Sequence, residues 1–159
     1  MRVSFTLNGR KNDIEVPAEM RLVDLLHDHF EIKSLHPSCY GGECGNCAVL
    51  FNGELTYSCI LPASSARDSN IFTFEGISRL PDYEDILEGF RIEKSYPCAY
   101  CLPSKVVITQ SILESTLDPA SEEVLEILAG TYCPCTNFLN LTKGILRAAT
   151  IRRTRLHGR

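Results

Sequence analysis

Apolar and polar residues alternate along the first segment of the chain, which is the period of a half-buried strand. Residues 3–7 place valine, phenylalanine and leucine on one side of this predicted strand. The Asn-Gly pair that follows predicts a turn, and residues 14–16 can return as the second strand of a hairpin. Leucines between positions 22 and 26, followed by His29, then have the spacing of a helix with one buried stripe.

A second hairpin is predicted around Asn52-Gly53, a pair that strongly favours a type I′ turn. Residues 49–51 and 55–57 flank this turn as strands, and the sequence "IFTF" at 71–74 supplies one more. Up to about residue 75 the pattern therefore predicts a small mixed sheet crossed by a helix.

The pattern changes between residues 76 and 82, where glycine, serine and proline interrupt it, and we expect a domain boundary there. Beyond this point the apolar positions repeat with a helical period, in segments around 86–90, 102–113, 124–128 and 138–145. Ser121 is expected to cap the third of these helices. The sequence predicts an α+β chain in which residues 1–76 form a domain built on a sheet and residues 83–152 form a four-helix bundle.

Composition and charge exclude several classes of protein. A chain of 159 residues is long enough for two small domains but too short to hold a large cofactor enzyme by itself. A net charge of −4 gives no case for nucleic-acid binding, and no run approaches the roughly 20 apolar residues of a membrane span. The polar N-terminal segment does not resemble a signal peptide, so we expect a cytoplasmic protein. In that reducing setting its eight cysteines are expected to be metal ligands or redox groups.

Three cysteines lie in the glycine-rich segment "CYGGECGNC", and a fourth follows downstream. These residues, which we name the first quartet, are Cys39, Cys44, Cys47 and Cys59. Their CxxxxCxxC spacing is that of plant-type [2Fe–2S] ferredoxins. A negatively charged cluster needs backbone N–H donors near its sulfurs, and the glycines let the loop approach closely. Zinc fits less well because only Cys44 and Cys47 have a CxxC spacing. His36 is expected to be a surface or hydrogen-bonding residue rather than a ligand.

The other four cysteines, which we name the second quartet, are Cys98, Cys101, Cys133 and Cys135. The first two are spaced CxxC at the start of a predicted helix, and the last two are spaced CxC between two helices. Alone, a CxxC pair also fits a thioredoxin-like redox pair or half a zinc site, although the βαβ context of thioredoxin is missing. If the helices that carry the two pairs face each other, the pairs close one four-thiolate site.

In the motifs "GGECGNC" with Cys59 downstream, "CAYC" and "CPC", the chain resembles the small iron–sulfur subunit of the molybdenum hydroxylases, the xanthine dehydrogenase and aldehyde oxidoreductase family. The resemblance extends from about residue 3 to about residue 150. It implies a β-grasp, plant-type ferredoxin-like domain followed by a four-helix bundle domain, each with one [2Fe–2S] cluster. It assigns the first quartet to the cluster nearer the flavin and the second quartet to the cluster nearer the molybdenum.

The resemblance also implies a role as a non-catalytic electron relay in an oxidoreductase, with no catalytic residue in this chain. Electrons would pass from a molybdopterin centre in a large subunit, through both clusters, to FAD in another subunit. A hetero-oligomer with these two partners is implied, for which a dimer of heterotrimers is one arrangement, and the substrate would be chosen in the large subunit. Two alternatives stay open, a stand-alone two-cluster ferredoxin and a zinc-stabilised interaction module.

The chain departs from the family pattern around the second quartet. Relatives read "QCGFCTPGM" where this chain reads "PCAYCLPSK", so Pro97 replaces a glutamine whose amide contacts the pterin. Similarly, "CRCTGY" becomes "CPCTNF", with Pro134 and Asn137 in place of arginine and glycine. We therefore expect docking to the pterin to differ, or the partner to bind another form of that cofactor. Tyr100 and Tyr132, which neighbour these cysteines, are expected to be core residues of the bundle or a shield over the site.

Overall fold

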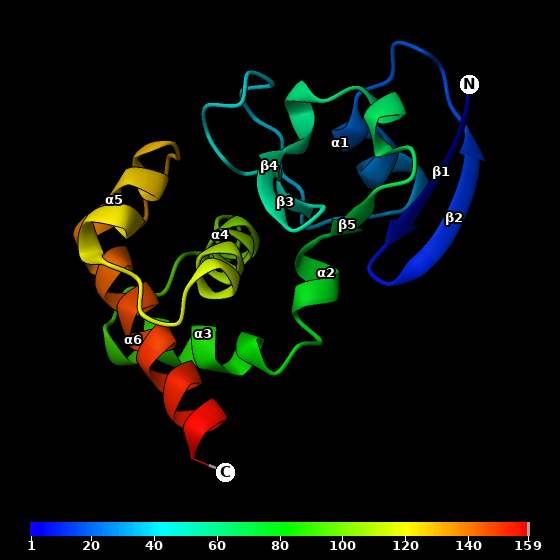
Figure 1. Cartoon of the computed structure of the whole chain (residues 1–159). Coiled ribbons are helices and arrows are strands. Elements are labelled where there is room, and N and C mark those ends of the chain that lie inside the picture. Colours follow the sequence, from blue (N-terminus) through cyan, green and yellow to red (C-terminus); the bar gives the residue numbers. More distant parts are fainter. Residues whose placement is uncertain (159) are drawn as a thin grey trace.

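Figure 1 shows the chain as a computed structural model whose description covers residues 1–158. The first half is built on a mixed five-stranded sheet in the order β2-β1-β5-β3-β4. The strands are β1 (Arg2–Leu7), β2 (Arg10–Glu15), β3 (Ala48–Phe51), β4 (Glu54–Tyr57) and β5 (Asn70–Phe72). Strand β1 runs parallel to β5, and the other neighbours are antiparallel.

The first hairpin has the arrangement that its alternating pattern predicts. Val3, Phe5 and Leu7 of β1 are buried, and the polar residues between them are more exposed. Asn8 and Gly9 form the turn with φ values of 49° and 82°. Positive φ at both central positions is the geometry of a type I′ turn, whose twist matches that of the flanking strands.

The predicted helix after this hairpin differs from a regular α-helix. Helix α1 spans only Leu22–Asp24 and continues as a π-helical turn, η1, over Leu25–His29. Leu25 and Leu26 are buried, whereas His29 is exposed. The buried stripe of leucines is confirmed up to Leu26, and His29 lies outside it, because the wider turn of a π-helix breaks the period of 3.6 residues.

Four helices lie where the helical period predicts them, after a short helix α2 (Phe74–Ile77) that follows β5 directly. They are α3 (Asp82–Ile92), α4 (Leu102–Ser115), α5 (Ser121–Ala129) and α6 (Phe138–His157). Helix α4 lies between the sheet on one side and α5 and α6 on the other (Figure 1). No helix within residues 1–158 is both long enough and apolar enough to cross a membrane.

The starts of α5 and α6 are capped by residues that the pattern did not identify. The N-cap of α5 is Ala120, and Ser121 is the first residue inside the helix, so the predicted serine cap was wrong. The backbone N–H of Ala120 donates to Glu123 Oε2 at 3.2 Å and is thereby satisfied. Asn137 caps α6, because its Oδ1 accepts a hydrogen bond from the N–H of Asn140 at 2.8 Å.

Helices α3 and α6 approach closely where each carries a glycine. A Cβ added at Gly89 would lie 2.6 Å from the backbone nitrogen of Ala148 and 2.6 Å from the carbonyl oxygen of Gly144. A Cβ added at Gly144 would lie 2.9 Å from the ring of Phe90. Since backbone atoms cannot move aside as side chains can, the two helices would have to separate to accept a larger residue at this crossing.

We expect Gly89→Ala to lower the free energy of unfolding by about 3 kcal/mol, at the upper end of typical overpacking costs. Urea denaturation of the cluster-loaded protein, followed by far-UV circular dichroism, measures the change. Gly130→Ala is the matched control, because its added Cβ would have no heavy atom closer than 3.6 Å. The control should change stability by less than about 0.5 kcal/mol, and equal effects of the two variants would contradict the prediction.

Charged side chains tie the end of α6 to the start of α3. Arg152 Nε donates to Asp82 at 2.9 Å, and Arg155 Nε donates to Asp85 at 2.8 Å. Arg155 also reaches Asp82, and Arg152 Nη1 donates to the carbonyl of Leu113 in α4 at 2.7 Å. These two arginines of the basic C-terminal segment therefore hold three helices together.

Two apolar clusters form the core of the protein. One packs the sheet against α1 and η1, and the other fills the space between the helices. Strand β3 takes part in both, because Val49 joins the first cluster while Ala48 and Leu50 join the second. The chain is thus a mixed α and β structure whose two halves share a packed boundary along β3.

Candidate metal centres

The first quartet lies on the loop before β3 and on a short 3₁₀ helix, η2 (Ser58–Ile60), which follows β4. Three backbone N–H groups donate to the sulfur of Cys39 at 3.3 to 3.4 Å, those of Gly41, Glu43 and Cys44. These hydrogen bonds, with that of Gly41 the strongest, lower the pKa of Cys39 to about 6. The loop therefore supplies the N–H donors that a negatively charged sulfur site needs.

The other members of the first quartet are buried, with exposed fractions of 9% for Cys44, 1% for Cys47 and 2% for Cys59. Burial is the main cause that raises the pKa of Cys47 to about 12, and the nearby thiol of Cys59 adds to it. Thiols of this kind bind metal as thiolates, and the metal supplies the positive charge that removes their protons. The donor set has the softness that iron–sulfur clusters and zinc prefer.

The second quartet comes from two loops, one that leads into α4 and one between α5 and α6. The sulfur atoms of Cys98, Cys101 and Cys135 all lie within 4.8 Å of one another. Cys133 Sγ lies 3.0 Å from Cys135 Sγ, and the N–H of Cys98 donates to Cys135 Sγ at 3.3 Å. The structure therefore brings the CxxC and CxC pairs together at one point.

Burial and hydrogen bonds act on the buried thiols of this quartet in opposite directions. Burial, the largest cause, raises the pKa of Cys101. Burial also raises the pKa of Cys133, but hydrogen bonds from Cys135 and from the N–H of Thr136 outweigh it, so that the pKa of Cys133 is lowered overall. Four sulfurs so close together fit a group that binds them all as thiolates.

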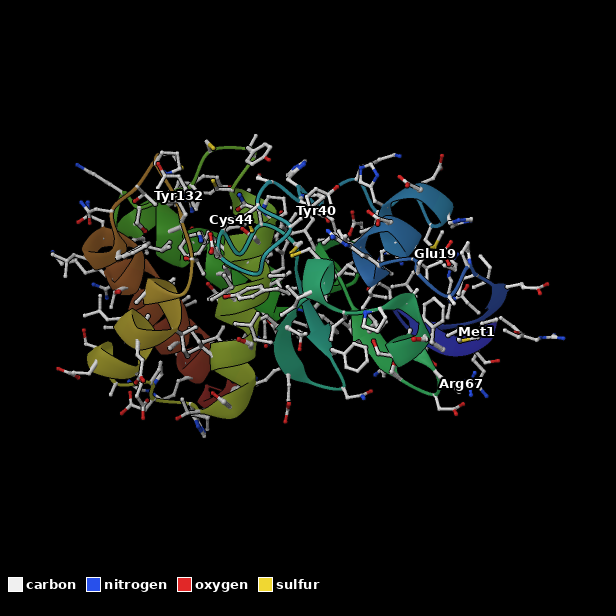
Figure 2. The ribbon with its side chains drawn as sticks, turned by 90° about the horizontal axis from the view of Figure 1, so that it is seen from above. Met1, Glu19, Tyr40, Cys44, Arg67 and Tyr132 are labelled. Atoms are coloured by element: carbon white, nitrogen blue, oxygen red, sulfur yellow. The ribbon has the colours of Figure 1, made fainter. Side chains whose placement is uncertain are left out.

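Direct contacts join the loops that carry the two quartets. The N–H of Tyr132 donates to the carbonyl of Cys44 at 3.0 Å, and Figure 2 shows these two residues near each other where the halves meet. Gly45 has a φ of +76° and faces Thr131, since a Cβ added to it would lie 2.9 Å from Thr131 Cγ2. Only glycine combines this φ with such a close approach.

A second bridge runs through a buried serine of α4. Ser104 Oγ lies 3.3 Å from Asn46 Oδ1 and 2.9 Å from the carbonyl of Cys101. Asn46 is part of the first loop and has an exposed fraction of 6%. The first-quartet loop is thus connected to the turn that carries Cys101 without an intervening layer of side chains.

The aromatic neighbours of the second quartet are not core residues, contrary to one of the two expectations for them. Tyr100 is 47% exposed and Tyr132 is 63% exposed. The ring of Tyr100 stacks on His36 with centroids 4.4 Å apart, and its hydroxyl lies 2.9 Å from Ser38 Oγ. These contacts hold the CxxC turn against the chain segment that leads into the first quartet.

The residues that depart from the family pattern differ in their exposure. Pro97 is buried, whereas Pro134 and Asn137 are exposed and line a surface hollow together with Lys94. Asn137 also has the capping role in α6 described above, which its place in the motif did not reveal.

The sequence pattern also did not identify the buried lysine of α4, Lys105. The signal that could have found it is a charged residue on an otherwise largely apolar stretch of a predicted helix.

Comparisons with known proteins divide the chain into two parts. Residues 5–70 match the model of the 2Fe-2S iron-sulfur cluster binding domain, and residues 73–146 match that of a [2Fe-2S] binding domain. The nicotinate dehydrogenase small FeS subunit of Eubacterium barkeri is 31% identical over 139 residues, which cover 87% of this chain and 88% of that protein. The nicotine 6-hydroxylase small subunit of Paenarthrobacter nicotinovorans is 27% identical over 148 residues, or 93% of this chain and 89% of that one.

A solved structure has the same fold over almost the whole length. Quinoline 2-oxidoreductase from Pseudomonas putida 86 contains a chain that is 29% identical to this one, with a TM-score of 0.87. The match covers 99% of this chain and 97% of the other.

Proposed function

The chain belongs to the family of small iron–sulfur subunits of the molybdenum hydroxylases, and on that premise we propose which of its cysteines bind its two [2Fe–2S] clusters. It is an electron-transfer subunit of a heteromeric oxidoreductase. We assign one cluster to the first quartet and the other to the second quartet. When bound, each cluster accepts and releases one electron.

The observation that carries this assignment is the convergence of the second quartet. Its two pairs are separated by more than thirty positions in the sequence, yet three of its sulfurs lie within 4.8 Å of one another and the fourth is 3.0 Å from one of them. In the first quartet, the N–H of Cys44 donates to the sulfur of Cys39 at 3.4 Å, and the thiol of Cys59 is close enough to that of Cys47 to raise its pKa. These contacts support a site in which each pair binds one of the two irons.

We propose that the chain has two domains, residues 1–76 and residues 83–152, and that the second is a four-helix bundle made by α3, α4, α5 and α6. Contacts of α6 with α3 and α5, together with the apolar cluster between the helices, support the bundle. The boundary between the two family matches, at residues 70–73, supports a division close to the end of the sheet.

We further propose the electron route and the partners. The second quartet would receive electrons from a molybdopterin centre in a large subunit, and the first quartet would pass them to FAD in another subunit. The exposed side of the second quartet, next to Pro134 and Asn137, offers a surface for the large subunit. A dimer of heterotrimers in the cytoplasm is the assembly that we propose.

Purification of the complex from native cells tests this function. We expect about four irons and four acid-labile sulfides per chain, two distinct paramagnetic signals after reduction, and molybdenum and flavin in the same fractions. A colourless chain that contains zinc would instead support an interaction module. An iron-containing chain that elutes alone from gel filtration, without molybdenum or flavin, would support a stand-alone ferredoxin.

A further inference from the structure

A lysine side chain is buried between the two quartets. Lys105, in the first turns of α4, has no exposed surface. Its Nζ donates to Thr131 Oγ1 at 2.8 Å, and that hydroxyl in turn donates to the carbonyl of Leu128 at 2.9 Å. Thr131 is the residue that Gly45 of the first-quartet loop packs against. The ammonium group therefore lies at the junction of the two cysteine-bearing loops.

Among residues 1–158, this ammonium has no carboxylate partner. None of the ion pairs within residues 1–158 involves Lys105, and Thr131 is its one side-chain acceptor. A buried lysine without a counter-charge is rare, because removal of an ammonium from water has a large free-energy cost. For the buried ammonium of Lys105 to keep its charge, a negatively charged group other than a carboxylate must lie close to it.

Cysteines of both quartets are near neighbours in the chain of the groups that surround this ammonium. The N–H of Lys105 donates to the carbonyl of Cys101 at 3.2 Å, one helical turn earlier. Cys133 follows Thr131 by two residues, and Cys44 precedes Gly45, which packs against Thr131. Deprotonated thiols of the second quartet, from the start of α4 and from the loop after α5, stabilise its charged form, as does Cys44 of the first quartet. Burial acts against this and lowers the pKa of Lys105. In the protein with its clusters bound these sulfurs are thiolates, so the negative charge is present on both sides of the lysine.

We propose that Lys105 is a charge-compensating residue shared by the two [2Fe–2S] clusters and that it raises the reduction potentials of both. The inference rests on the assignment of the quartets to the clusters. Reduction adds one electron, and hence one negative charge, to a cluster without adding a proton to the lysine. A cation in a buried setting stabilises the more negative, reduced form, because little water is present to screen it. The effect should be larger on the second-quartet cluster, because Lys105 lies one helical turn after Cys101 and its acceptor Thr131 lies two residues before Cys133.

Lys105→Met removes the charge and keeps an unbranched side chain of similar length. We expect a fall in the reduction equilibrium constant of the second-quartet cluster of about tenfold, which is about 59 mV for one electron, and a smaller fall for the other cluster. The measurement is a potentiometric titration of the full-length, cluster-loaded chain with dithionite, in which each cluster is followed by its EPR signal. Lys94→Met is the matched control, since Lys94 is exposed beside the second quartet and water screens its charge.

Iron and sulfide analysis of the unaltered chain comes first, because it tests the proposed function independently of the role of Lys105. If that chain lacks two clusters, the proposed function itself is wrong. If both clusters are present and Lys105→Met leaves both potentials unchanged, or shifts them no more than Lys94→Met, only the role of Lys105 is overturned.

If the methionine variant does not retain its clusters, Lys105→Arg is the second variant to measure. Arginine keeps the charge but alters the shape of the side chain. Retention of both clusters in the arginine variant, with their loss in the methionine variant, would support a requirement for the charge. Equal loss in both variants would mean that the shape of lysine matters rather than its charge, and would overturn the proposal.

Discussion

Cys133→Ser is expected to abolish one of the two [2Fe–2S] clusters and to leave the other intact. Iron–sulfur clusters of this type are held by four thiolates, and the neighbouring sulfur of Cys135 is already committed to the same site. The iron content should fall from about four to about two per chain. One EPR signal and about half of the visible absorbance should disappear, while the signal of the first-quartet cluster should persist because its four sulfurs lie on other loops.

Pro134→Ala provides the control for this variant. Pro134 is exposed and stands between the two cysteines of the CxC pair, so the change affects the same loop without altering a thiol. Both signals should remain in the control. Cys39→Ser should give the complementary result, with loss of the other signal, and retention of both signals in Cys133→Ser would contradict the assignment of the second quartet.

Gly45→Ala is expected to have the second large effect, on the contact between the loops. The added Cβ would lie 2.9 Å from Thr131 Cγ2 and 3.1 Å from Thr131 Cβ, and alanine would also have to adopt a φ of +76°. Thr131 is held by hydrogen bonds with Lys105 and Leu128, so its side chain cannot readily rotate away. We expect a loss of about 3 kcal/mol in the free energy of unfolding, measured by urea denaturation of the cluster-loaded protein. EPR signals of both clusters should also broaden.

Gly53→Ala separates backbone strain from the steric clash. Gly53 has a φ of +85°, but a Cβ added to it would have no heavy atom within 4 Å. The control should therefore lose only about 1 kcal/mol, the cost of a left-handed conformation, and should leave both EPR signals unchanged. Thr131→Ser removes the Cγ2 methyl group while it keeps the hydroxyl, so it should partly restore the Gly45→Ala variant. Equal losses in Gly45→Ala and Gly53→Ala would mean that the close contact has no energetic importance.

Much of the fold could be predicted from local patterns. The alternation in residues 3–7 and the two Asn-Gly turns placed both hairpins, because strand period and turn chemistry are properties of adjacent residues. The break between residues 76 and 82 separated the sheet from the longer helices for the same reason. The start of α5 lies one residue earlier than predicted, because Ala120 is the N-cap and the side chain of Glu123 accepts a hydrogen bond from the N–H of Ala120.

The two groups of cysteines could be recognised from spacing, but their surroundings could not. Whether Tyr100 lies in the core or at the surface depends on its contact with His36, a residue more than sixty positions earlier in the sequence. The burial of Lys105 likewise depends on the loop that contains Thr131. Contacts between segments this far apart leave no periodic trace in a single sequence. The π-helical turn at Leu25–His29 is a further difference from the regular helix that the apolar period predicts.

The hydrogen bond between Tyr132 and Cys44, and the contact of Gly45 with Thr131, have a consequence for how fast electrons move inside the assembly. Tunnelling rates fall steeply with distance, and with the clusters assigned to the two quartets as we propose, their separation is set by contacts within one polypeptide. The internal hop should therefore be insensitive to how neighbouring subunits shift during turnover. In the route that we propose, only the entry and exit of electrons cross subunit boundaries, and only these two steps would depend on how the subunits dock.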